Sequence, residues 1–110
     1  MLQYLPQKST LANIAMIKCG MAHVLALTKS DDFYVCGSNM SGQLGLGIIN
    51  IKAIQPVKLN LDRIATFACG EFYSVAVTYL NEIYVWGSNK NGQLGLDQKH
   101  DQLTPSRLDF

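Results

Sequence analysis

The sequence predicts an all-β protein built from β-propeller blades of four antiparallel strands, with about two blades in the chain. Three observations indicate this fold class. A stretch of about 50 residues occurs twice, and each copy contains short runs rich in β-branched and aromatic residues. The central run of each copy also carries no charged side chain on either face. A period near 50 with about four strands is typical of a propeller blade.

Length and composition favour a single folded repeat domain over residues 1–110. Of the 110 residues, 48% are hydrophobic and 15% are charged, which argues against disorder. The formal net charge is +1 and the 9 basic residues are scattered, so charge predicts no nucleic-acid partner. No apolar run approaches the roughly 20 residues of a membrane span, and residues 1–10 do not resemble a signal peptide.

The three cysteines, Cys19, Cys36 and Cys69, do not predict a disulfide framework, because their number is odd and none are close in sequence. Cys19 and Cys69 occupy the same place in the two copies. Equivalent positions of stacked sheets lie about 10 Å apart, whereas a disulfide needs Cα atoms within about 7 Å. We therefore expect free thiols and an intracellular protein, cytoplasmic or nuclear.

The two copies align when the chain is shifted by 50 residues. Residues 6–46 and 56–96 are then identical at 19 of 41 positions. We place the first unit at about 6–55 and the second at about 56–105. Pro105 follows Pro56 by 49 residues, so residues 105–110 are expected to start a third unit or to form a closing strand.

Each unit is expected to form strands separated by turn-forming residues. The first strand is predicted at 14–18 in one unit and at 64–68 in the other. The second and third strands are predicted at four further runs: 23–28 (HVLALT), 33–36 (FYVC), 73–78 (YSVAVT) and 83–86 (IYVW). A fourth strand is predicted within 51–59.

The second strand of each unit indicates how the sheets are packed. His23, Leu25 and Leu27 form a bulky side, while the alternate residues Val24, Ala26 and Thr28 form a smaller one. The second copy has the same division, with Tyr73, Val75 and Val77 against Ser74, Ala76 and Thr78. A strand without charge on either face is usually covered on both sides. We therefore expect sheets stacked on sheets.

A glycine-rich phrase follows the third strand of each unit, CGSNMSGQLGL in one and WGSNKNGQLGL in the other. The spacing G-x-x-x-x-G is that of a phosphate loop, but Gln43 and Gln93 stand where the lysine would be. We therefore predict no cofactor, and interpret the phrase as a packed connector in which Asn39 and Asn89 bond the backbone downstream. The residues expected to build the repeat are Gly20, Gly37, Asn39, Gly42, Gln43, Gly45, Gly70, Trp86, Gly87, Asn89, Gly92, Gln93 and Gly95.

Taken together, the segments ACG, SVAVT, IYVW and WGSNKNGQLGL resemble the regulator of chromosome condensation repeat, and the resemblance extends from Pro6 to about Pro105. It implies a seven-bladed β-propeller with four-stranded blades. Two positions depart from the family pattern. Cys36 replaces the aromatic residue that Trp86 supplies, and His23, which resembles a family histidine, has Tyr73 as its copy.

Two units cannot close a ring, because propellers have about 4–8 blades and repeat proteins usually need at least three units. Neither unit resembles a polar cap. We therefore expect the chain to form part of a longer protein or to associate with copies of itself.

No catalytic or metal-binding residue is predicted, so the chain is not expected to be an enzyme. His23 is expected to be a buried, hydrogen-bonded residue, and His100 lies in a polar stretch without other ligands. Asp31, Asp32 and Asp62 are expected to be solvated turn residues. Possible protein contacts are Met40, Tyr79 and Lys90.

The resemblance implies three functions. The first is a non-catalytic protein-interaction platform. The second is guanine nucleotide exchange on a Ran-type small GTPase. In the family this activity uses a protruding wedge from one blade, and neither unit has an insertion able to supply it, since the two periods are nearly equal. The third is a propeller that binds a small ligand between blades. We favour the first, with a protein partner and no membrane association.

Overall fold

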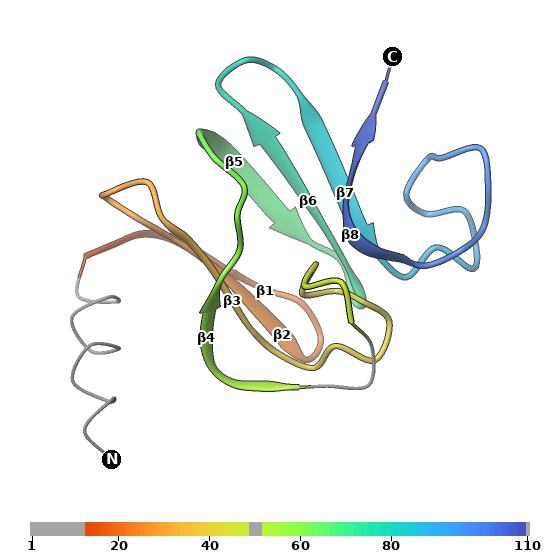
Figure 1. Ribbon diagram of the computed structural model, residues 1–110, viewed down its shortest axis with the longest axis horizontal. Coiled ribbons are helices and arrows are strands. Elements are labelled where there is room, and N and C mark those ends of the chain that lie inside the picture. Colours follow the sequence, from red (N-terminus) through yellow and green to blue (C-terminus); the bar gives the residue numbers. More distant parts are fainter. Residues whose placement is uncertain (1–12, 49–51, 110) are drawn as a thin grey trace.

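The computed structural model describes residues 13–48 and 52–109. Within these ranges all regular secondary structure is β-strand, in two four-stranded antiparallel sheets (Figure 1). The part of the repeat alignment at residues 6–12 falls outside the described residues. So do the predictions that involve residues 49–51 and 110. None of the described residues forms a helix long and apolar enough to cross a membrane.

The first sheet has its strands paired in chain order. They are β1 (Ile14–Cys19), β2 (His23–Thr28), β3 (Phe33–Gly37) and β4 (Ala53–Lys58). The predicted positions of these strands are confirmed, and β1 extends one residue further than expected because Cys19 still pairs with Val24. Between Val35 and Gly37 the register with β4 shifts, so residues of β4 bulge out of the ladder.

The second sheet repeats this order with β5 (Ile64–Cys69), β6 (Tyr73–Thr78), β7 (Ile83–Gly87) and β8 (Gln102–Leu108). Its outer strand β8 pairs with β7 and contains most of the residues expected to start a third unit or a closing strand. Pro56 and Pro105, which begin the sequence units, lie inside β4 and β8. The sheets are therefore offset from the sequence units by a few residues.

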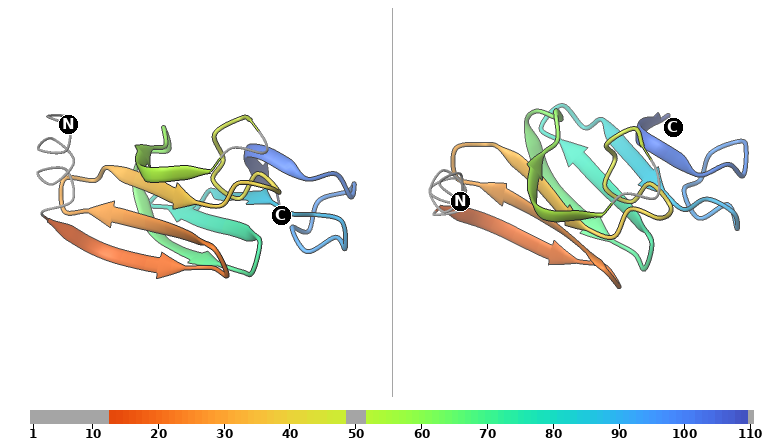
Figure 2. Two further views of the ribbon diagram at one scale, coloured as in Figure 1. Left: turned by 90° about the horizontal axis from the view of Figure 1, so that it is seen from below. Right: turned by 60° about the horizontal axis from the view of Figure 1, so that its bottom comes forward.

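The two sheets stack face to face, with β1 lying against β5 (Figure 2). Opposite residues of antiparallel strands point to the same side of a sheet. The pairings of Leu25 with Val35, and of Leu27 with Phe33, therefore define the bulky face of the first sheet. The pairings of Ala76 with Phe67 and Tyr84 define the smaller face of the second. These two faces meet.

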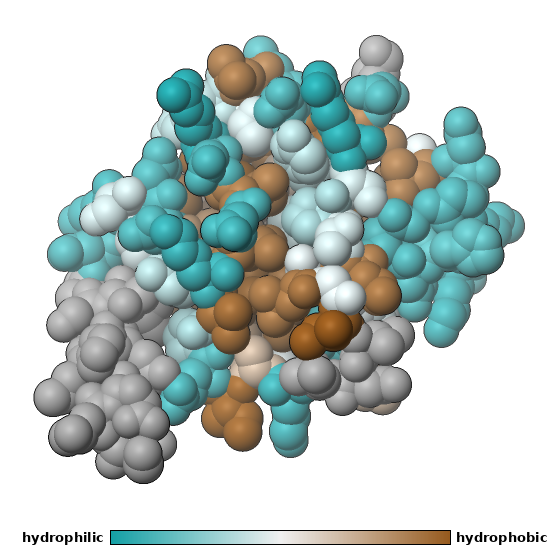
Figure 3. All heavy atoms as spheres, viewed as in Figure 1, coloured by the Kyte–Doolittle hydropathy of each residue, from teal (hydrophilic) through white to brown (hydrophobic). Residues whose placement is uncertain are grey.

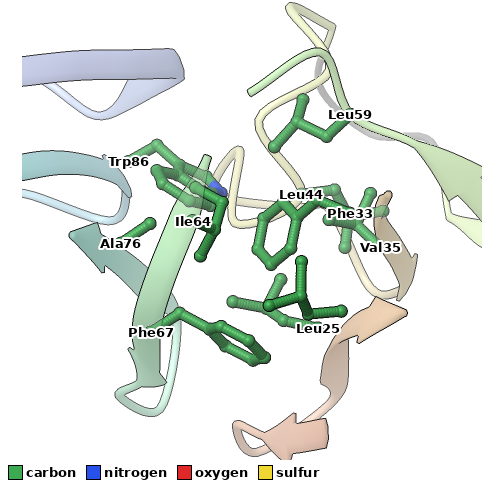
Figure 4. Packing of buried hydrophobic residues seen from close by; sticks show 10 residues of the cluster. Leu25, Phe33, Val35, Leu44, Leu59, Ile64, Phe67, Ala76 and Trp86 are labelled. Atoms are coloured by element: carbon green, nitrogen blue, oxygen red, sulfur yellow. The ribbon is translucent and has the colours of Figure 1, made fainter. Parts of the chain in front are cut away.

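A continuous hydrophobic core joins the sheets (Figure 4). The Phe33 ring lies edge-on to the Phe67 ring, with centroids 5.2 Å apart and an interplanar angle of 70°. Phe33 also meets Trp86 edge-on at 6.4 Å. Aromatic pairs prefer this arrangement, so Phe33 links the first sheet to two strands of the second.

The prediction that other sheets cover both faces of β2 and β6 holds for one face of each sheet, although Ala26 and Thr28, on the outer face of β2, are also buried. On the outer face of the second sheet, Tyr73, Val75 and Val77 are half-buried. On the outer face of the first sheet, Ile17 is 53% exposed. No further sheet among the described residues packs there. Figure 3 shows hydrophobic residues concentrated between the sheets and hydrophilic ones over the loop that precedes β8.

Candidate functional site

Two loops of nearly identical sequence follow β3 and β7. We call residues 38–48 the first glycine loop and residues 88–101 the second. In the first, Asn39 Oδ1 accepts from the Leu44 amide at 3.0 Å, and Asn39 Nδ2 donates to the Ile48 carbonyl at 2.6 Å. Asn89 does the same for the Leu94 amide and the Gln98 carbonyl, at 3.1 and 2.7 Å. Each asparagine thus bonds the backbone downstream, as predicted, and closes a loop wider than an Asx-turn.

The glutamines of these loops also bond locally. Gln43 Oε1 accepts from the Ser41 amide at 2.9 Å, and Gln93 Oε1 accepts from the Asn91 amide at 3.0 Å. Leu44 and Leu94, one residue further along, are both buried. The loops are therefore packed connectors. Gln43 and Gln93 occupy the place of a phosphate loop's lysine, and no helix among the described residues follows either loop.

The first glycine loop also docks on the second sheet. The backbone carbonyl of Gln43 accepts two hydrogen bonds of 2.9 Å, from Ser74 Oγ and from Trp86 Nε1. Gly42 lies so close to β8 that an added Cβ would be 2.8 Å from Leu103 Cδ2. The Gly47 amide donates to the Leu103 carbonyl at 2.8 Å. One loop thus links β6, β7 and β8.

His23 completes this buried network, and its predicted burial and hydrogen bonding are confirmed. Its side chain is 1% exposed, and Nε2 lies 3.0 Å from Ser74 Oγ. Because the Ser74 hydroxyl hydrogen goes to Gln43, the serine oxygen accepts from a protonated Nε2. Burial lowers the pKa of His23, and the Tyr73 backbone partly offsets this effect. The imidazole therefore joins the two sheets as a neutral ring.

Close packing explains why a glycine, Gly20 or Gly70, stands shortly before β2 and β6. The His23 ring occupies the space that a side chain at Gly20 would need, and the Tyr73 ring does the same at Gly70. The turns containing these glycines meet between the sheets, where the Met21 amide donates to the Glu71 carbonyl at 3.1 Å. A positive φ is adopted by Gly37, Gly42, Gly45, Gly87, Gly92 and Gly95.

The three predicted contact residues are exposed, but the fold does not bring them together. Met40 is 64% exposed, and Lys90 is an exposed residue whose Nζ lies 3.9 Å from Asp101 Oδ2. Both belong to the glycine loops. Tyr79, 68% exposed, lies in the turn between β6 and β7, at the other end of the strands.

Sequence reasoning missed several exposed apolar residues. Leu80, beside Tyr79, is 66% exposed, and Met21 is 65% exposed in the turn after β1. Their copies in the other unit are Ser30 and Glu71. A large apolar residue aligned with a polar copy was the available signal, because such a position does not need an apolar side chain in both units.

A polar pocket of about 390 Å³ lies beside Tyr79. Its lining includes Asp62, Arg63, Leu80 and Glu82. The Tyr79 amide donates to the Arg63 carbonyl at 2.8 Å, which fixes the turn against the segment between β4 and β5. We call Tyr79, Leu80 and this pocket the Tyr79 surface. This surface combines exposed apolar side chains with acidic and basic ones.

The described residues contain no cluster of three or more His, Cys, Asp or Glu side chains that could hold a metal ion. As predicted, Asp31 and Asp62 are exposed, while Asp32 pairs with Lys58 at 3.1 Å. His100 is exposed in the second glycine loop. The three cysteines are free thiols, and burial raises the pKa of Cys36 and raises that of Cys69 to about 11. Both thiols are therefore protonated near neutral pH and are weak nucleophiles.

The fold and the recurring loop match a known family. The family model of the regulator of chromosome condensation (RCC1) repeat matches residues 30–77 and 81–110, and a second model of this repeat matches residues 64–93. The chain belongs to the RCC1 repeat family. The two sheets are accordingly two blades of an RCC1-type propeller. No curated protein sequence gives a significant match to the chain.

Solved structures of RCC1-type proteins resemble the chain. Human WBSCR16 has a TM-score of 0.77 at 26% identity, over 87% of this chain and 26% of that one. Yeast RCC1 (Prp20) in complex with Kap60 has a TM-score of 0.77 at 27% identity, over 89% and 23%. Prp20p from Saccharomyces cerevisiae has 0.74 at 26% identity, over 88% and 26%. The RCC1-type chain described here therefore spans about a quarter of the length of these proteins.

Proposed function

We propose that the chain is a non-catalytic protein-interaction module made of two blades of a larger RCC1-type propeller. The observation that carries this proposal is the Tyr79 surface, where two large apolar residues lie exposed in a turn beside a pocket with charged residues. Aromatic residues at the centre of such surfaces often dominate binding energy. A protein is therefore the kind of partner that this surface fits.

The arrangement of titratable groups supports a non-catalytic role. His23 is enclosed between the sheets, where it bonds to Ser74 and cannot reach a substrate. The acidic side chains of the turns are solvated or paired with lysine or arginine, as in the contact of 3.5 Å between Arg107 Nη1 and Glu82 Oε2. We infer an intracellular location, cytoplasmic or nuclear, from the free thiols.

The second candidate is guanine nucleotide exchange on a Ran-type small GTPase. It is favoured by the similarity to yeast Prp20p, whose structure is described together with its binding properties to Gsp1p and histones. The sequence gives this function less support, because the two units are nearly equal in length and neither contains an insertion that could supply a wedge. A small GTPase nevertheless remains a partner worth testing.

Two measurements on the whole chain test the proposal. The first is binding of a Ran-type GTPase loaded with labelled GDP, and the second is the rate of GDP release. We expect release at the intrinsic rate whether or not the GTPase binds. Acceleration of release by the chain would replace the interaction module with an exchange factor.

Capture of protein partners from a cell extract tests the surface itself. We expect Tyr79→Ala combined with Leu80→Ser to abolish capture, because it removes both exposed apolar groups. Met40→Ser, which removes an equally exposed apolar residue at the opposite end, is the matched control. Capture that survives the first variant but not the control would place the binding surface on the glycine loops.

A further inference from the structure

The contact between the first glycine loop and the second sheet provides a template for contacts between neighbouring blades. We call Ser74 and Trp86 the donor pair, since both donate to the Gln43 carbonyl at 2.9 Å. Gln43 itself is completely buried by this contact. Leu103 of β8 then covers Gly42, so the loop is held by two polar donors and one aliphatic side chain.

The second glycine loop has the same sequence at these positions, GQLGL, but no neighbouring sheet covers it among the described residues. Gln93 is exposed, and no indole or hydroxyl group of the described residues donates to its carbonyl. A Cβ placed on Gly92 would meet nothing within 4 Å. The φ angles of Gly42 and Gly92 are nonetheless similar, at 80° and 72°. The second loop is thus already shaped for the contact that the first loop makes.

The free face of the first sheet does not offer this contact to a second copy of the chain. Val24 stands at the place of Ser74, and Cys36 at the place of Trp86. Valine has no donor and a thiol is a weak one, so a carbonyl buried against this face would lose both hydrogen bonds. Ile17, Val24, Tyr34 and Cys36 instead line a small apolar hollow of about 100 Å³.

The outer strand of the first sheet, β4, has an aliphatic residue at the place of Leu103. Ala53 and Gln102 pair with the equivalent glycines Gly37 and Gly87, so Ile54 corresponds to Leu103. Leu103 is covered by the first glycine loop, whereas Ile54 is 86% exposed. The first sheet can therefore supply the aliphatic cover, but it lacks the donor pair.

We propose that the second glycine loop is a docking surface for a further four-stranded sheet that presents an indole N–H and a hydroxyl group at the positions of Trp86 and Ser74. A second copy of this chain is not that partner, because Val24 and Cys36 cannot replace the donor pair. The inference rests on the proposal that the two blades belong to a larger propeller. It favours completion of the propeller by blades that differ from β1–β4 over assembly from copies of this chain.

The test restores the donor pair to the first sheet and measures self-association of the whole chain. We expect the natural chain to sediment as a monomer. The variant Val24→Ser with Cys36→Trp is expected to associate head to tail, with an apparent dissociation constant tighter by about tenfold or more. Equal association of the natural chain and the variant would overturn the inference, yet it would leave the larger propeller intact as a proposal.

A matched substitution locates the contact. Gly92→Asn keeps the loop, because asparagine tolerates a positive φ and the side chain enters open space. In a docked complex the same side chain would collide with the residue at the place of Leu103. We therefore expect Gly92→Asn to abolish the association of the double variant, and association that survives would contradict the proposal.

Circular dichroism checks that each variant is folded. If the double variant does not fold, Cys36→Trp alone supplies the stronger donor on an outer face, where no core packing is lost. With that variant, concentration-dependent amide shifts at residues 92–96 support the docking surface. Shifts confined to other residues, or the absence of any shift, would overturn it.

Discussion

The indole N–H of Trp86, on β7, donates a hydrogen bond of 2.9 Å to the backbone carbonyl of Gln43, in a loop that belongs to the other sheet. Ser74 Oγ donates to the same oxygen at the same distance. Both partners of the indole bond are fully buried. A buried carbonyl without a partner would be costly, so the second sheet satisfies the loop of the first.

Replacing Trp86 by phenylalanine keeps an aromatic ring in the core but removes the donor to Gln43. We expect Trp86→Phe to lower the free energy of unfolding by about 1–2 kcal/mol, from one lost hydrogen bond and some lost packing. Urea unfolding followed by circular dichroism measures this value. Tyr79→Phe, in an exposed turn, is the control, and equal stability of the two variants would contradict the role given to Trp86.

Gly42 and Gly92 form a matched pair, since their φ angles are alike and only their surroundings differ. Alanine at either position strains the left-handed backbone by about 1–2 kcal/mol. At position 42 the new Cβ would also lie 2.8 Å from Leu103 and 2.9 Å from the Gln102 carbonyl oxygen. We expect Gly42→Ala to cost about 1–3 kcal/mol more than Gly92→Ala. Equal unfolding midpoints would show that the first loop does not dock on β8.

His23 makes stability depend on pH. Burial lowers its pKa below the ordinary value of 6.5, so the unfolded chain binds this proton more readily than the folded protein. Stability is therefore unaffected by this group above pH 6.5, and falls as the pH decreases from there towards the lowered folded pKa. The expected loss is seen as a lower urea midpoint at about pH 5.5 than at about pH 7.5.

The variant His23→Gln isolates this effect, because its amide can still donate to Ser74 but does not titrate. We expect the difference in urea midpoint between the two pH values to shrink in this variant. His100→Gln, in an exposed loop, should retain the full difference. A pH dependence that is unchanged by His23→Gln would contradict the assignment.

The cysteines should react with a maleimide at different rates. Cys19 is exposed, whereas burial raises the pKa of the Cys69 thiol to about 11. Because the thiolate is the reactive form, Cys69 should label at least about tenfold more slowly in the folded protein than in urea. Mass spectrometry of timed samples gives the rate at each site. Equally rapid labelling of all three cysteines would show that the face of Cys69 is open to solvent.

Most of the fold could be predicted from the sequence, because repetition adds evidence that one copy alone lacks. The strand HVLALT is ambiguous by itself, but YSVAVT at the same place in the second unit shows which properties are required. The absence of charged side chains from both faces of this strand correctly indicated that the sheets stack. The burial of His23 followed from the same alternation, since it shares a face with Leu25.

The contacts between units could not be predicted, because they depend on how far each loop reaches in space. The acceptor at Gln43 is a backbone carbonyl, which every residue has. Nothing in the sequence therefore marks it as the acceptor for Ser74 and Trp86. The same holds for Gly42 against Leu103, which are 61 residues apart in the chain. Because the two loops have the same sequence around Gln43 and Gln93, the sequence does not show that Gln43 is buried and Gln93 exposed.

The central claim is that the bulky face of the first sheet packs directly on the small face of the second. Nuclear Overhauser contacts between side chains of the two sheets test it most directly. We predict contacts between the ring protons of Phe33 and Phe67, whose centroids lie 5.2 Å apart, and between Phe33 and the Trp86 indole. Contacts confined to strands within each sheet, with none between these rings, would contradict the account.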